Sequence, residues 1–111
     1  PDAGLLYDAC DRGQITIYIP TMCLVEIVYL QEKGRITADL KTKLDAELSS
    51  GATGLRLADL TDKVVEAMAL IARLEIPEMP DRVIAATAMH LNLSLISRDR
   101  KIRSSRVTTV W

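Results

Sequence analysis

Two aspartates frame residues 80–102, PDRVIAATAMHLNLSLISRDRKI, and their spacing restricts the folds open to this chain. Residues 81–91 have the apolar pattern of a helix, and residues 93–97 have the composition of a short strand. At ~1.5 Å per residue the helix spans roughly 16 Å, and at ~3.3 Å per residue the strand returns roughly the same distance. In a parallel α/β domain Asp81 and Asp99 are therefore expected at the same edge of the sheet, where such sheets hold their ligands.

The rest of the chain alternates helical and strand patterns in the same way. Helices are predicted over residues 2–12, 21–33, 37–49, 61–74 and 81–91, and strands over residues 15–19, 55–58, 93–97 and 107–110. Thr21, Thr37 and Thr61 are the expected N-caps of three of these helices. Residues 76–80 are expected to be a loop, and a basic turn follows Asp99. This alternation predicts a mostly parallel sheet covered by helices on both faces.

Composition limits the class of protein. The 111 residues are enough for one domain with a single core, which must be aliphatic because the chain has no Phe. A formal net charge of −1 excludes a uniformly basic nucleic-acid binder. No apolar run reaches the ~18 residues of a membrane span, and Cys10 and Cys23 lack a metal-binding or redox spacing. We therefore expect a cytoplasmic protein with reduced cysteines and no membrane contact.

Glu26 is the only charged residue in the nine-residue stretch MCLVEIVYL, residues 22–30. It falls in the second turn of a helix that begins where the preceding strand ends, so it is expected at the same sheet edge. A carboxylate in apolar surroundings must become neutral, pair with a cation or bind a metal. The structural alternative is a narrow solvent-facing stripe with Glu26 on it.

Asp81 and Asp99 also have structural explanations when each is taken alone. An acid at a helix start is favoured by capping and by the helix dipole, and Asp99 has Arg98 and Arg100 as neighbouring partners. Three carboxylates from three segments at one edge are harder to explain, because they repel unless a divalent cation holds them. Oxygen-only ligands suit Mg²⁺ or Mn²⁺, and these ions support phosphodiester cleavage.

Side chains around Asp99 add to this interpretation. Ser97 could orient a metal-bound water, or it could simply be a hydroxyl at the end of a strand. Between residues 98 and 106 five basic residues accompany a single acid, and this run could hold a phosphate backbone. The expected RNA-binding residues are Arg98, Arg100, Lys101 and Arg103. His90, the only histidine, is explained by its place near a helix C-terminus.

Three segments together resemble the PIN domain, the metal-dependent ribonuclease fold of VapC-type toxins in bacterial toxin–antitoxin systems. The stretch PDRVIAATAMHLNLSLISRDRKI is similar to the C-terminal half of that family. PTMCLVEIVYLQEKGRI, residues 20–36, resembles its second acidic segment, and the final VTTVW resembles its closing strand. The resemblance implies a three-layer α/β/α fold with a mostly parallel central sheet.

By position, the resemblance makes Glu26, Asp81 and Asp99 catalytic metal ligands for Mg²⁺ or Mn²⁺, with Ser97 in support. It implies an RNA substrate, a homodimer and a cognate antitoxin protein. The family's first, central strand carries a fourth acid, and nothing in this chain matches it, so residues 1–111 are expected to be a single, N-terminally truncated PIN-like domain. The expected function is a toxin endoribonuclease. The alternatives are a catalytically inactive PIN-like module that binds a protein or RNA, and a DNA-directed nuclease.

Overall fold

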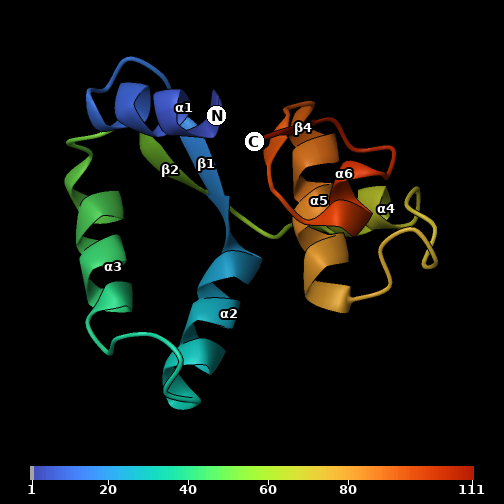
Figure 1. The fold of residues 1–111 in the computed structure, drawn as a ribbon, viewed down its shortest axis with the longest axis horizontal. Coiled ribbons are helices and arrows are strands. Elements are labelled where there is room, and N and C mark those ends of the chain that lie inside the picture. Colours follow the sequence, from blue (N-terminus) through green and yellow to red (C-terminus); the bar gives the residue numbers. More distant parts are fainter. Residues whose placement is uncertain (1) are drawn as a thin grey trace. The chain divides into compact units, whose positions relative to one another are not determined.

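The computed structural model describes residues 2–111, which form six helices and four short strands joined as an α/β chain (Figure 1). In chain order the elements are α1 (Asp2–Asp11), β1 (Ile17–Pro20), α2 (Thr21–Glu32), α3 (Leu40–Ser50), β2 (Leu55–Ala58), α4 (Asp62–Met68), α5 (Met79–Leu91), β3 (Leu95–Ile96), α6 (Arg100–Arg103) and β4 (Thr109–Val110). Each helix and strand predicted from the sequence is present, although several are shorter. The residue contacts divide the chain into two compact units, one of residues 4–59 and one of residues 60–111 with the first residues of α1.

The N-terminal unit, residues 4–59, is built on a parallel pair of strands. β1 pairs with β2 in a register that runs from Ile17 opposite Leu55 to Pro20 opposite Ala58. Gly54 fastens this pair to the end of α1, because its N–H donates to the Cys10 carbonyl at 2.9 Å. A Cβ at this position would collide with the Ile15 carbonyl, so the close approach requires glycine.

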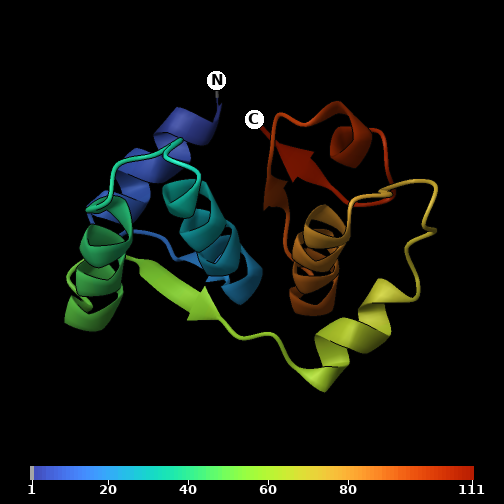
Figure 2. The ribbon, with the colours of Figure 1, turned by 90° about the horizontal axis from the view of Figure 1, so that it is seen from below.

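The C-terminal unit, residues 60–111, contains a second parallel pair. Leu95 lies opposite Thr109 and Ile96 opposite Val110. Helix α5 lies between α4 and these strands (Figure 2). The buried core is aliphatic, as expected from the absence of Phe, and the small side chains of α5 allow close packing. Its members are Val64, Ile71, Ile76, Ala85, Ala86, Ala88, Ile102 and Val107.

One of the three predicted helix caps is confirmed and two are wrong. The Thr61 hydroxyl caps α4 by accepting a hydrogen bond from the Val64 N–H at 3.4 Å. The Thr21 hydroxyl instead donates to the Ala58 carbonyl at 3.3 Å, because the neighbouring strand β2 brings that acceptor within reach. Thr37 lies outside α3, whose N-cap is Asp39.

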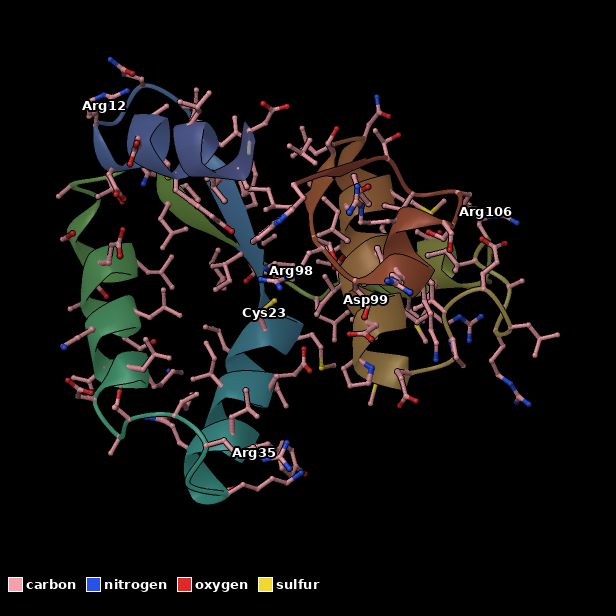
Figure 3. All side chains as sticks on the ribbon, viewed as in Figure 1. Arg12, Cys23, Arg35, Arg98, Asp99 and Arg106 are labelled. Carbon is pink, nitrogen blue, oxygen red and sulfur yellow. The ribbon has the colours of Figure 1, made fainter. Side chains whose placement is uncertain are left out.

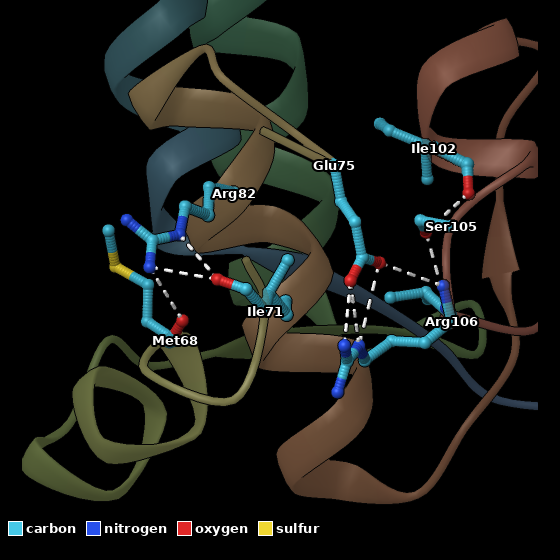
Figure 4. Close-up of polar contacts among 8 residues, drawn as sticks. Met68, Ile71, Glu75, Arg82, Ile102, Ser105 and Arg106 are labelled. Atoms are coloured by element: carbon cyan, nitrogen blue, oxygen red, sulfur yellow. Dashed lines mark hydrogen bonds and ion pairs between the residues drawn. The ribbon is translucent and has the colours of Figure 1, made fainter. Parts of the chain in front are cut away.

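The helix predicted over residues 61–74 ends at Met68, so that prediction is wrong in its second half. The Arg82 guanidinium donates to the Met68 carbonyl at 3.1 Å and to the Ile71 carbonyl at 2.9 and 3.1 Å (Figure 4). These bonds engage the carbonyl of Met68, the last residue of α4, and the carbonyl of Ile71, and residues 69–75 continue as turns and a bend. Ile71 is nevertheless fully buried, whereas Val65 on α4 is 55% exposed.

Smaller differences lie around the two aspartates. Helix α5 begins at Met79, before the expected end of the loop, because Pro80 is tolerated in a first helical turn. The basic turn after Asp99 forms the single-turn helix α6. In the part of the chain that the structure describes, no helix has the length and apolar character needed to cross a membrane. The single domain expected over residues 1–111 stays a prediction.

Candidate metal and nucleic-acid site

Asp81 lies in the first turn of α5, and its side chain is half-buried. The N-cap position belongs to Glu78, which makes no side-chain capping bond. Within residues 2–111 the Asp81 carboxylate receives no hydrogen bond and joins no ion pair. Capping of α5 therefore does not account for an acid at this position.

Electrostatics couple Asp81 to the second aspartate. Burial raises the pKa of the Asp81 carboxyl, and the negative charges of Asp99 and Glu78 raise this pKa further, with Lys101 acting in the opposite direction. The repulsion means that the structure brings Asp81 and Asp99 within electrostatic reach, although they lie 18 positions apart in the sequence. The pair forms the acidic part of the candidate site.

Asp99 has a structural task that involves one of its two carboxylate oxygens. Its Oδ1 accepts from the Lys101 N–H at 2.9 Å and from the Ile102 N–H at 3.1 Å, which caps α6. Its Oδ2 accepts no hydrogen bond from any described residue. The Ser97 hydroxyl accepts from the Asp99 N–H at 3.1 Å and so fixes the turn between β3 and α6. In the described chain Asp99 forms no ion pair with Arg98 or Arg100, the partners expected from the sequence.

Glu26 lies in the second turn of α2, in the N-terminal unit, and is half-buried. The apolar residues around it include Val25, which is 42% exposed, and α2 has no fully buried residue. Within neither unit do the described residues bring together three His, Cys, Asp or Glu side chains that could hold a metal ion. The role of Glu26 as a third ligand stays a prediction.

Within the C-terminal unit the donor set fits a hard divalent cation. The Asp81 carboxylate and Asp99 Oδ2 are oxygen donors without a hydrogen-bonding partner among residues 2–111, and their charges repel. A divalent cation between them would remove this repulsion, and carboxylate oxygens are the ligands that Mg²⁺ and Mn²⁺ prefer.

Exposed cations lie beside the acidic pair. Arg100, Lys101 and Arg103 are exposed on α6 and form no ion pair with the described residues. The Arg98 guanidinium lies over the Trp111 ring, 5.3 Å from its centroid. Figure 3 shows Arg98 and Asp99 in succession after β3. His90 is exposed in the last turn of α5, which agrees with its structural explanation.

Two residues of this region were not selected from the sequence. Glu78 adds negative charge to Asp81 from three residues upstream, and its signal was a second acid within the loop sequence IPEMPD. Trp111 contacts Arg98 through the pairing of β3 with β4, and its signal was a lone tryptophan after a basic run.

Comparison with known proteins shows that residues 3–106 match the family model described as PIN domain. This range contains Glu26, Asp81, Ser97 and Asp99. No curated protein and no solved structure matches the chain.

Proposed function

Because this chain belongs to the PIN-domain family, whose members are generally metal-dependent nucleases, we propose that it is a divalent-metal-dependent endoribonuclease. The observation that carries the proposal is the half-buried Asp81 carboxylate, which has no hydrogen-bonding partner among residues 2–111 and lies within electrostatic reach of Asp99, together with the exposed cations of α6. We further propose that the protein is the toxin of a type II toxin–antitoxin pair. Its partners would be an RNA substrate, a cognate antitoxin and a second copy of itself, in the cytoplasm.

Asp81, Asp99 and Glu26 are the residues that would hold Mg²⁺ or Mn²⁺. When bound, the ion supplies an activated water and stabilises phosphoryl oxygens. The chain's own residues prepare the site: the Lys101 and Ile102 N–H groups donate to Asp99 Oδ1, and Oδ2, which accepts no hydrogen bond from the described residues, would bind the ligand. Ser97 holds the Asp99 backbone in place, and Arg100, Lys101 and Arg103 bind the phosphates of the substrate.

Replacement of one acid tests the proposal. Asp81→Asn is expected to lower Mg²⁺-dependent cleavage of single-stranded RNA by about a hundredfold or more, because the charge that holds the ion is lost. Asp62→Asn is the matched control, since Asp62 occupies the first turn of α4. Circular dichroism of both variants checks the fold. Full cleavage activity in Asp81→Asn would refute the assignment.

A catalytically inactive PIN-like module that binds a protein or RNA is the second candidate. It is favoured by the absence of three grouped metal-ligand side chains within either unit of residues 2–111. Titration with Mn²⁺ separates the two, because an inactive module should bind no ion through these carboxylates. A DNA-directed nuclease is distinguished by comparing cleavage of single-stranded RNA with cleavage of flap DNA.

A further inference from the structure

Trp111 is the only tryptophan of the chain, and the residue is 39% exposed. The Arg98 guanidinium lies over the ring at 5.3 Å from the centroid. We propose that Trp111 and Arg98 form a platform on which one base of single-stranded RNA stacks next to Asp99. This inference deepens the proposed nuclease function and rests on it.

The strand pairing places the platform close to the candidate metal site. The Ser97 N–H donates to the Val110 carbonyl at 3.0 Å, which continues the register of Ile96 opposite Val110. The next position of this parallel register puts Trp111 beside Ser97. The Ser97 hydroxyl in turn accepts from the Asp99 N–H. The tryptophan is therefore linked through one serine to the turn that positions the Asp99 carboxylate.

The chemistry around the ring is that of a single-strand binding surface. Bases stack on aromatic rings and on guanidinium planes, whatever their sequence, and cations along the path of the backbone neutralise its phosphates. Here the stacked pair is followed directly by α6, whose Arg100, Lys101 and Arg103 are exposed and unpaired among the described residues. A base on the platform would place its neighbouring phosphates along this basic helix.

The structural alternative is that Arg98 and Trp111 only fasten β4 to β3. An exposed cation–π contact stabilises a fold weakly, and such a contact requires no ligand. The two explanations predict different RNA binding. If Arg98 and Trp111 only join β4 to β3, the presence of bases in the strand should not affect binding at the ring. If they form a platform, single-stranded RNA should bind better than an abasic strand and better than a duplex, whose base faces are covered.

Tryptophan fluorescence measures this directly, because Trp111 is the chain's sole source of it. The titration uses the Asp81→Asn variant in EDTA, so that no strand is cut, with short single-stranded oligouridylate as the probe. We expect saturable quenching by oligouridylate and little quenching by an abasic ribose-phosphate strand of the same length or by duplex RNA. Equal quenching by the abasic strand would overturn the proposal.

Substitutions separate stacking from charge. Trp111→Ala is expected to weaken binding of oligouridylate roughly tenfold or more, followed by fluorescence anisotropy of labelled RNA, while Trp111→Phe retains most of the affinity. Arg98→Lys keeps the charge but loses the planar stack, and Arg73→Ala, at an exposed arginine of the same unit, is the charge control.

Trp111→Ala should leave the salt dependence of RNA binding unchanged, whereas Arg103→Ala should reduce the slope of log affinity against log salt concentration by about 0.7.

The outcomes distinguish this proposal from the nuclease assignment. If RNA cleavage depends on Asp81 but Trp111→Ala and Trp111→Phe both bind oligouridylate like wild type, the platform is refuted and the nuclease remains. If oligouridylate quenches Trp111 fluorescence but the wild-type protein does not cut RNA with Mg²⁺ or Mn²⁺, the nuclease assignment fails and the base platform remains. The quenching titration with Asp81→Asn keeps Trp111 itself, so the test holds even if Trp111→Ala does not fold.

Discussion

The surroundings of the Asp81 carboxylate differ from those of an acid that caps a helix. An acid that caps a helix accepts backbone N–H bonds, and these bonds lower its pKa. The pKa of Asp81 is raised instead, by burial first and then by the charges of Asp99 and Glu78. A nearby cation would stabilise the charged form of Asp81. Among the causes of the pKa shift only the Lys101 charge acts in this direction, and it does not offset the others.

Glu75 shows the opposite effect and gives a prediction on pH dependence. The Arg106 guanidinium lies 2.7 Å from Glu75 Oε1, and this hydrogen bond, followed by that from the Arg106 backbone N–H, lowers the pKa of Glu75 (Figure 4). A lowered pKa in the folded state stabilises the fold above the unfolded-state pKa of about 4.3, and the contribution is lost as the pH falls through the folded-state pKa. Glu75→Gln should therefore lower the free energy of unfolding at neutral pH.

Urea denaturation over a range of pH checks this expectation. The difference between wild type and Glu75→Gln should shrink toward zero in acid, where wild-type Glu75 is also neutral. Glu66→Gln serves as the control, because its contact with Lys63 is a 3.4 Å pair on one exposed helix face. A difference that stays constant from neutral to acidic pH would show that the Arg106 contact is not its cause.

At the scale of elements, Arg82 joins two helices that are consecutive in the chain. Its guanidinium bonds to the Met68 and Ile71 carbonyls hold the end of α4 against the start of α5, the helix that carries Asp81. Bonds to a charged donor contribute about 1.5–3 kcal/mol each. We expect Arg82→Ala to lower the free energy of unfolding by about 2 kcal/mol, with Arg82→Lys between it and wild type because an ammonium lacks the planar fork.

The measurement is urea denaturation followed by circular dichroism, with Arg73→Ala as the matched loss of an exposed arginine. Equal stability of Arg82→Ala and Arg73→Ala would mean that the bonds to Met68 and Ile71 do not hold α4 in place. Because Arg82 follows Asp81 directly, a loosened α5 should also weaken cleavage of RNA.

The elements that sequence reasoning found are those set by local chemistry. Thr61 caps α4 as predicted, and the spacing of apolar residues gave the existence of each helix and strand. The errors arise where a distant group competes for a backbone or side-chain partner. The Thr21 hydroxyl bonds to the Ala58 carbonyl, and the Arg82 guanidinium bonds to the Met68 and Ile71 carbonyls. Neither contact has a signal in the neighbouring sequence.

In the candidate site, too, local patterns predicted some features, whereas features that depend on distant contacts were missed. Equal lengths of helix and strand were enough to predict that Asp81 and Asp99 approach each other, and their charges do interact. Trp111 was overlooked because its proximity to Arg98 depends on the pairing of β3 with β4, and Glu78 because its effect depends on burial of its neighbour. The ligand roles of Glu26, Asp81 and Asp99 stay predictions.

For the whole molecule, the PIN-like α/β class expected from the sequence is confirmed by the family match and by the two parallel strand pairs. Family membership supports a nuclease that uses a divalent ion. The toxin role, the antitoxin and the homodimer remain proposals. Glu26 belongs to the unit of residues 4–59 and Asp81 and Asp99 to the unit of residues 60–111, so each unit carries part of the predicted ligand set.

The proposal that Glu26, Asp81 and Asp99 bind a divalent metal ion is tested by isothermal titration calorimetry with Mn²⁺. Wild-type protein should bind the ion, and Asp81→Asn, Asp99→Asn and Glu26→Gln should each weaken binding by about tenfold or more, because each removes one charged ligand. Asp62→Asn should bind as wild type does. Binding of Mn²⁺ that is unchanged in all three acid variants, or no binding by the wild type, would contradict the account.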